Sequence, residues 1–174
     1  MRYIYVLLLS LVFITASCGQ GTSKADQTDG KTTYYLIRHA EKDRSDSSNR
    51  NPDLKAEGRE RAQRWAQRFD DVDFDVIYST DYNRTQQTAT PTAKSKGLTV
   101  QSYDPSKLYD EAFQKATEGK TVLIVGHSNT TPQFANAIMG KNHFPAIDDS
   151  DNGNLFIVTI TKDGKKLPQH EQMD

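Results

Sequence analysis

The chain has 174 residues, of which 35% are hydrophobic, and it carries 22 Lys and Arg against 23 Asp and Glu. That hydrophobic content is enough for the core of one domain, since domains cluster at about 100–150 residues. The single cysteine excludes a disulfide framework, and the formal net charge of −1 gives no basic footprint for a nucleic-acid partner.

The first 17 residues have the pattern of an export signal. Arg2 precedes an apolar run too short to span a membrane comfortably, and small residues lead to Cys18. This resembles a bacterial lipoprotein signal, in which the thiol is acylated and becomes the N-terminus; the alternative is an ordinary signal peptide with an incidental cysteine. Residues 18–31 lack large apolar side chains and are predicted to be a flexible tether. The sequence thus predicts an exported domain, residues 32–174, anchored through Cys18 on the periplasmic or cell-surface side of a bacterial membrane.

Strand-like and helix-like segments alternate along this domain. In chain order we predict a strand over residues 33–37, a helix over 56–69, a strand over 74–79, a helix over 81–96, a strand over 98–103, a helix over 105–117, a strand over 121–125, a helix over 131–139 and a strand over 154–161. Gly97 and Gly140 end two of the helices, and Pro91 must start, kink or break part of the first of these. Asp104 is predicted to cap the helix that Pro105 opens.

This order of elements predicts an α/β fold, a three-layer α/β/α sandwich around a mainly parallel sheet. The continuous apolar run 121–125 suits a strand covered on both faces. The strand 154–161 is expected to be antiparallel or at an edge. In such folds, sites form at the carboxyl ends of the strands.

Three strand ends carry side chains of chemical interest. The first strand leads into Arg38 and His39, the fourth leads into His127, and the second leads into a helix whose first turn contains Arg84. Each of these residues alone has an ordinary structural explanation, such as a loop hydrogen bond or a solvated charge. Their joint placement at one edge of one sheet predicts a site.

These motifs resemble the histidine phosphatase superfamily, which has the phosphoglycerate mutase-like fold. The resemblance spans about residues 33–161 and rests on Arg38-His39-Ala40, Asp53-Leu54-x3-Gly58-x3-Ala62, Ser79-x4-Arg84-Thr85-x2-Thr88-Ala89 and Gly126-His127-Ser128. It implies that His39 is a nucleophile that becomes phosphohistidine. Arg38, Arg84 and His127 would then hold the phosphate, and no metal or other cofactor is required.

The chemistry of phosphoryl transfer agrees with this set of residues. Catalysis is mostly positioning and charge stabilisation, and guanidinium groups present planar forks of donors to phosphate oxygens. A histidine nucleophile must be neutral, and neighbouring guanidinium groups disfavour its protonation. Two further residues, Ser128 and Glu41, are also predicted to contact the substrate.

The group that protonates the leaving oxygen is left open. Asp104, beyond the third strand, is the first candidate for this general acid, although a helix-capping role would compete for the same carboxylate. Glu41, beside the nucleophile, is the second. The polar loop 42–50 contains three basic residues, which either attract an anionic substrate or are simply solvated.

The favoured function is a metal-independent phosphomonoester hydrolase acting on a small-molecule or protein substrate. Hydrolysis is preferred to mutase activity because the sequence has no long insertions to enclose the site. One alternative is a non-catalytic phosphate-binding lipoprotein of the same fold. A zinc hydrolase using His39, His127 and a carboxylate is disfavoured, because two guanidinium groups would repel the cation. His143 and His170 are expected to be structural or tail residues.

Overall fold

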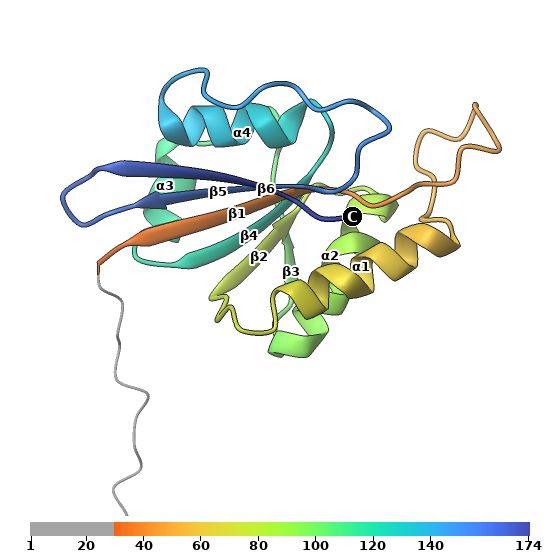
Figure 1. Ribbon diagram of the computed structural model, residues 1–174, viewed down its shortest axis with the longest axis horizontal. Coiled ribbons are helices and arrows are strands. Elements are labelled where there is room, and N and C mark those ends of the chain that lie inside the picture. Colours follow the sequence, from red (N-terminus) through yellow and green to blue (C-terminus); the bar gives the residue numbers. More distant parts are fainter. Residues whose placement is uncertain (1–29) are drawn as a thin grey trace, which may run out of the picture.

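The computed structural model describes residues 30–174 (Figure 1). The predicted signal peptide, the predicted lipidation site Cys18 and nearly all of the predicted tether lie outside the described residues, so they stay predictions. The described elements are β1 (Thr32–Arg38), α1 (Ala56–Arg68), β2 (Val76–Ser79), α2 (Asn83–Lys96), β3 (Val100–Ser102), α3 (Glu111–Thr117), β4 (Thr121–Gly126), α4 (Thr130–Met139), β5 (Asn154–Ile160) and β6 (Lys166–Gln172).

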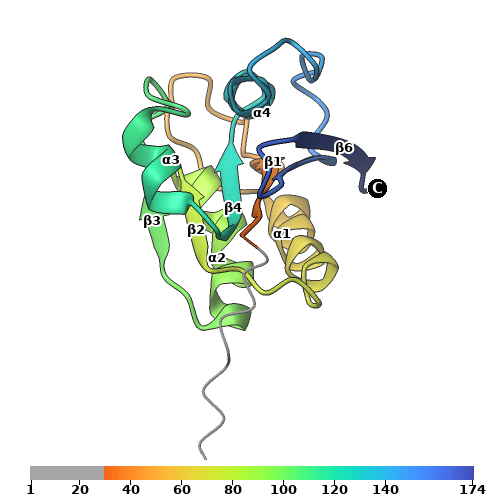
Figure 2. The ribbon, with the colours of Figure 1, turned by 90° about the vertical axis from the view of Figure 1, so that its left-hand side faces the viewer.

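The strands form one six-stranded sheet in the order β3-β2-β4-β1-β5-β6. The first four in this order are parallel to one another, whereas β5 and β6 run antiparallel to their neighbours. The sheet lies between α3 and α4 on one face and α1 and α2 on the other (Figures 1 and 2). The predicted three-layer architecture with a mainly parallel sheet is therefore confirmed.

Alternation along β1 divides the core between the two faces of the sheet. Tyr34 and Leu36 pack in a cluster with Phe134 of α4, while Ile37 packs in a second cluster with Trp65 of α1. Successive side chains of a strand point to opposite faces, so one central strand supplies both layers. Both central strands, β1 and β4, are almost wholly buried. For β4, the apolar run at 121–125 predicted this burial.

A glycine fixes how α1 meets the loop that follows β1. A Cβ atom on Gly58 would lie 2.2 Å from the backbone oxygen of Glu41. No side chain fits at that separation, so the helix approaches this loop closely only because residue 58 is glycine. The loop that leaves the sheet next to His39 is thereby held against α1.

The prediction for the helix over 105–117 is wrong at its start. Asp104 accepts hydrogen bonds from the Ser106 backbone N at 2.9 Å and from Ser106 Oγ at 2.7 Å, which makes a local turn. The helix begins at Glu111, and Asp110 caps it by accepting from the Phe113 backbone N at 2.8 Å. Both aspartates have the chemistry of a cap, and the sequence signal selected the wrong one.

The C-terminal strand β6 was not predicted. Its sequence, KLPQHEQ, is polar and contains Pro168, and most of its side chains are partly or fully exposed. These features suit an edge strand, where an unpaired backbone meets solvent and proline is tolerated. Because β6 covers one side of β5, β5 is antiparallel as predicted but does not lie at the edge.

Two further observations concern α2 and membrane-spanning helices. Pro91 lies inside α2, which continues from Asn83 to Lys96 and ends at Gly97 in the left-handed conformation. Among residues 30–174, no helix has both the length and the apolar character needed to cross a membrane.

Candidate active site

The two histidine motifs meet because β1 and β4 are neighbours in the sheet. Arg38 pairs in register with Gly126 at the carboxyl ends of these parallel strands, and the His39 backbone N donates to Gly126 O at 2.9 Å. The rings of His39 and His127 consequently lie with their centroids 5.4 Å apart. The predicted juxtaposition of the two histidines is present.

His39 is held as a neutral imidazole with one defined tautomer. Its side chain is almost fully buried, and its Nδ1 lies 2.7 Å from the Ala40 carbonyl oxygen. A carbonyl only accepts, so Nδ1 carries the proton and Nε2 keeps its lone pair. Burial lowers the pKa of His39 to about 3, and the charges of Arg38 and Arg84 act in the same direction, against the bond to Ala40. The ring is therefore ready to act as a nucleophile at neutral pH.

This lowered pKa predicts a pH-dependent stability. The unfolded chain binds a proton at His39 near pH 6.5, whereas the folded protein does so only near pH 3. The contribution of His39 to the free energy of unfolding should be complete above pH 6.5 and fall by about 1.4 kcal/mol per pH unit below it. Urea unfolding between about pH 7 and about pH 5 measures this slope. The variant His39→Asn should have a shallower slope; identical slopes would contradict the assignment of a buried neutral imidazole.

His127 is oriented by contacts to both of its ring nitrogens. Its Nε2 lies 2.9 Å from Thr80 Oγ1, and Arg84 Nη2 lies 3.5 Å from its Nδ1. The Thr80 hydroxyl itself donates to Thr85 Oγ1 at 3.0 Å, so it accepts from His127. Burial lowers the pKa of His127 to about 4, with further contributions from Arg84, Arg38 and Lys42. His127 thus carries its proton on Nε2 and is neutral in the free protein.

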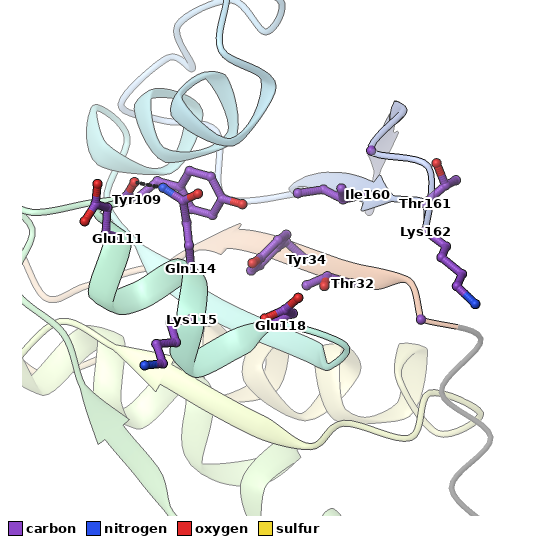
Figure 3. A pocket seen from close by; sticks show the side chains of 12 residues that line it. Thr32, Tyr34, Tyr109, Glu111, Gln114, Lys115, Glu118, Ile160, Thr161 and Lys162 are labelled. Atoms are coloured by element: carbon purple, nitrogen blue, oxygen red, sulfur yellow. Dashed lines mark hydrogen bonds between the residues drawn. The ribbon is translucent and has the colours of Figure 1, made fainter.

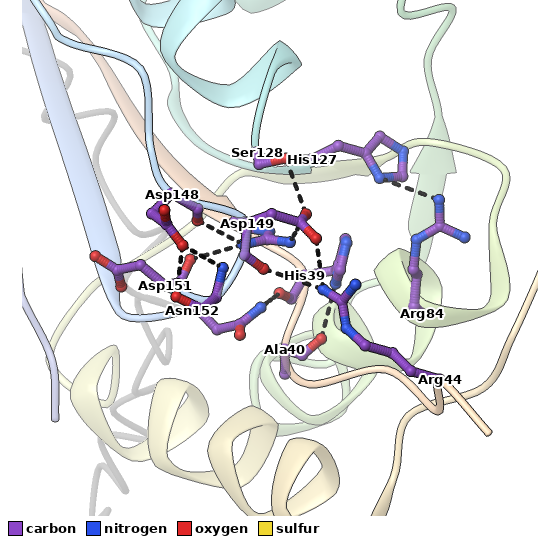
Figure 4. A network of polar contacts seen from close by, with 12 residues as sticks. His39, Ala40, Arg44, Arg84, His127, Ser128, Asp148, Asp149, Asp151 and Asn152 are labelled. Atoms are coloured by element: carbon purple, nitrogen blue, oxygen red, sulfur yellow. Dashed lines mark hydrogen bonds and ion pairs between the residues drawn. The ribbon is translucent and has the colours of Figure 1, made fainter. Parts of the chain in front are cut away.

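Arg84 completes this side of the cluster from the first turn of α2. Its guanidinium carbon lies 4.5 Å from the centroid of the Tyr82 ring, and that ring also contacts His127 edge-on at 5.1 Å. A guanidinium over an aromatic face is held by a cation–π interaction. Figure 4 shows Arg84 directed towards His127, so the two predicted phosphate contacts face one another.

Arg38 is fully buried and is engaged by the loop before β5. Its Nη1 donates to the backbone oxygens of Asp148 and Asp151 at 2.9 and 3.0 Å, and its Nη2 forms an ion pair with Asp149 Oδ1 at 2.5 Å. Within the described part of the chain, its Nε has no hydrogen-bond partner. Arg38 therefore joins the nucleophile to a segment more than 100 residues away.

The carboxylate of Asp149 bridges several groups of the cluster. Besides Arg38, it accepts from Arg44 Nη2 at 2.7 Å through Oδ2 and from Ser128 Oγ at 3.4 Å through Oδ1. Figure 4 shows Asp149 between Ser128 and Arg44. The predicted residue Ser128 thus lies at the cluster, and Arg44 from the basic loop contributes to it.

Among residues 30–174, the first candidate acid, Asp104, forms its side-chain hydrogen bonds with Ser106 and not with residues of this cluster. The Asp104 side chain is exposed and bonded to Ser106, and those hydrogen bonds lower the pKa of its carboxyl group, which opposes a role as a proton donor. Glu41 accepts from Arg61 Nε at 2.8 Å, so it pairs with α1. The general-acid role of Asp104 therefore stays a prediction, and Glu41 has a structural partner.

Three residues of the cluster were missed in the sequence. Thr80 orients His127, Asp149 binds both arginines, and Asn152 Nδ2 donates to the His39 backbone oxygen at 2.7 Å. Thr80 follows the end of β2, so its position at the carboxyl end of a strand was the signal that could have identified it. The signal for the other two was the run Asp-Asp-Ser-Asp-Asn before β5, whose polarity exceeds that of an ordinary connection.

A hollow of about 400 Å³ adjoins the cluster, and Lys42, Arg44, Asp149 and Asn152 are among its lining residues. A larger one, of about 500 Å³, lies at the other end of β1, between Tyr34, α3 and the β5–β6 turn (Figure 3). It contains none of the cluster residues. Among residues 30–174, no three His, Cys, Asp or Glu side chains are grouped as a metal ion would require.

Comparison with known sequences agrees with the motifs at the strand ends. Residues 34–105 match the model of the histidine phosphatase superfamily, branch 1, and this segment includes Arg38, His39 and Arg84. No curated protein gives a significant match to the sequence.

Solved structures share the fold at low sequence identity. A mycobacterial glucosyl-3-phosphoglycerate phosphatase superposes with a TM-score of 0.65 at 12% identity, covering 83% of this chain and 100% of that chain. The protein histidine phosphatase SixA, solved with tungstate, gives 0.64 at 14% identity, with 80% and 96% covered. Bacillus stearothermophilus YhfR gives 0.62 at 18% identity, with 82% and 98% covered. The phosphoglycerate mutase-like fold expected from the sequence is confirmed.

Proposed function

We propose that this chain is a member of the histidine phosphatase superfamily and that it hydrolyses phosphomonoesters through a phosphohistidine on His39. The observation that carries the proposal is a neutral imidazole, with its Nε2 lone pair available, beside Arg38, Arg84 and His127 at one edge of the sheet. Nucleophile and charge-stabilising groups are the two components that phosphoryl transfer requires.

The reaction has two steps. His39 Nε2 attacks phosphorus, the bond to the ester oxygen breaks, and the leaving oxygen takes up a proton from solvent water. Water then attacks the phosphohistidine and gives up a proton to solvent, the N–P bond breaks, and phosphate leaves with neutral His39 restored. Arg38 and Arg84 stabilise the charge on the equatorial oxygens in both steps.

Exposure of one side of the cluster favours transfer to water over transfer back to substrate. The side chains of Arg44 and Asp149 are 56% and 62% exposed, so solvent reaches the network around the nucleophile. A mutase needs an enclosed site that retains its intermediate, because water competes for the phosphoryl group. The similar structures include a glucosyl-3-phosphoglycerate phosphatase and a protein histidine phosphatase, which support a phosphatase without selecting a substrate class.

The test is hydrolysis of p-nitrophenyl phosphate by the purified protein at neutral pH, with and without excess chelator. This substrate has a good leaving group and depends little on a general acid. We expect measurable turnover that chelator leaves unchanged within twofold, because protein cations supply the charge stabilisation. Activity that chelator abolishes and zinc restores would contradict the proposal.

A non-catalytic phosphate-binding protein is the second candidate. It is favoured by the engagement of both candidate acids, Asp104 with Ser106 and Glu41 with Arg61. Such a protein would bind inorganic phosphate but would not hydrolyse p-nitrophenyl phosphate. Calorimetry with phosphate beside the hydrolysis assay separates the two candidates.

A further inference from the structure

Arg38 is buried and held by backbone contacts, whereas the side chain of its partner Asp149 is mostly exposed. The arginine is buried, and two backbone oxygens hold its Nη1. The Asp149 side chain is 62% exposed, and its contacts with the cluster are the ion pairs with Arg38 and Arg44 and the hydrogen bond from Ser128. Both side chains of the Arg44–Asp149 pair are exposed, and such a pair contributes little to stability. The pair with the buried Arg38 differs, because losing the carboxylate without a replacement would leave a buried charge unpaired. Another anion is therefore the group that can take the place of this carboxylate.

The contacts of Asp149 are those that a phosphate group would make. One carboxylate oxygen receives Arg38 Nη2 and the Ser128 hydroxyl, and the other receives Arg44 Nη2. Carboxylate and phosphate are both oxyanions that pair with guanidinium donors in similar geometry. An acceptor in this position therefore uses the same donors that a substrate needs.

Asp149 is ionised, as its contacts with Arg38 and Arg44 require. Partial burial acts to raise the pKa of its carboxyl group, but the hydrogen bond from Arg44 and the charge of Arg38 outweigh it and hold the pKa below the usual range. The side chain is consequently an anion at neutral pH. In the free protein the candidate nucleophile is also covered, with His39 only 3% exposed.

We propose that Asp149 is a built-in competitor for phosphate, whose carboxylate occupies donors of Arg38 and Arg44 until substrate displaces it. The proposal rests on the proposed function, because it assigns Arg38 to phosphate binding. The apparent affinity for phosphate is then the intrinsic affinity reduced by the fraction of molecules in which Asp149 has moved away. A doubly charged phosphoryl group displaces the carboxylate more readily than a singly charged anion does.

The matched variants Asp149→Asn and Asp148→Asn test this proposal. Each removes one negative charge from the same loop, but the Asp148 carboxylate bonds to Ser150 and not to Arg38. Calorimetric titration with inorganic phosphate should give an approximately tenfold lower Kd for Asp149→Asn than for the wild type. This corresponds to a wild type in which Asp149 occupies the arginine donors in about nine molecules in ten. The Kd of Asp148→Asn for phosphate should lie within about twofold of the wild-type value, because this variant loses the same charge but no carboxylate contact with Arg38.

Unchanged or weaker phosphate binding in Asp149→Asn would overturn the proposal. If that variant also lost turnover on alkyl phosphates but not on p-nitrophenyl phosphate, Asp149 would be the proton donor instead. Asp149→Ser serves as a second variant if the first does not fold. The titration measures binding and needs no catalysis. A protein that binds phosphate but does not hydrolyse p-nitrophenyl phosphate would therefore contradict the proposed enzyme activity and not the proposed role of Asp149.

Discussion

Replacing His39 with alanine is expected to lower kcat/KM for p-nitrophenyl phosphate by about a thousandfold or more, because the variant has no atom that can accept the phosphoryl group. The remaining arginines still bind phosphate but have no nucleophile to act with. The direct measurement is steady-state hydrolysis, together with mass spectrometry of the acid-sensitive phosphoenzyme after rapid mixing with substrate. The wild type should gain one phosphoryl group, and His39→Ala should gain none.

A suitable control for this experiment is His143→Ala. His143 is exposed after α4, and its ring contact is with Phe144. The control should retain turnover within about twofold, since surface substitutions away from special features change little. Retention of more than a tenth of the wild-type activity in His39→Ala would mean that another group is the nucleophile. His127 is the neighbour that would then be tested.

The part of the site that the sequence predicts follows from local rules. An apolar run identifies a buried strand, and the residue after it lies at the carboxyl edge where parallel sheets build their sites. Arg38, His39 and His127 each follow such a run, so the positions of the strands alone predict that these side chains lie close together. Arg84 needed one further step, the helix that begins after β2.

The remainder depends on contacts that span the chain. The ion pair from Arg38 to Asp149 joins residues 111 apart in sequence, and the Asn152 bond to His39 joins residues 113 apart. The local pattern of apolar and polar residues does not predict contacts between residues so far apart in sequence. The run 148–152 shows only that the loop is polar, and its role becomes visible when β5 is placed beside β1.

The errors in secondary structure have a similar origin. Asp104 followed by Pro105 is as good a helix start as Asp110 by local chemistry, and the choice between them is made by packing. Phe113 of α3 lies against Phe134 of α4, with ring centroids 5.1 Å apart, which fixes where the short helix sits. The edge strand β6 has no apolar stripe to predict it, because its pairing with β5 needs backbone groups and not side chains.

Arg38→Lys is expected to impair both turnover and folding, although it conserves the charge. The guanidinium of Arg38 reaches the Asp148 and Asp151 oxygens through Nη1 and Asp149 through Nη2. A lysine presents its donors from a single nitrogen and cannot span these acceptors or give phosphate a planar fork. We expect kcat/KM to fall about a hundredfold, as for loss of an oxyanion-stabilising donor. Leaving buried acceptors unpaired should lower the free energy of unfolding by about 2–3 kcal/mol.

Arg44→Lys is the matched control, because Arg44 shares the Asp149 contact but is 56% exposed. Its free energy of unfolding should change by less than about 0.5 kcal/mol. Urea unfolding and p-nitrophenyl phosphate hydrolysis on both variants separate the two roles of Arg38. Lost turnover with unchanged stability would mean that the 148–151 segment does not depend on this arginine. Lost stability with unchanged turnover would mean that Arg38 organises the loop and that Arg84 and His127 bind the phosphate without it.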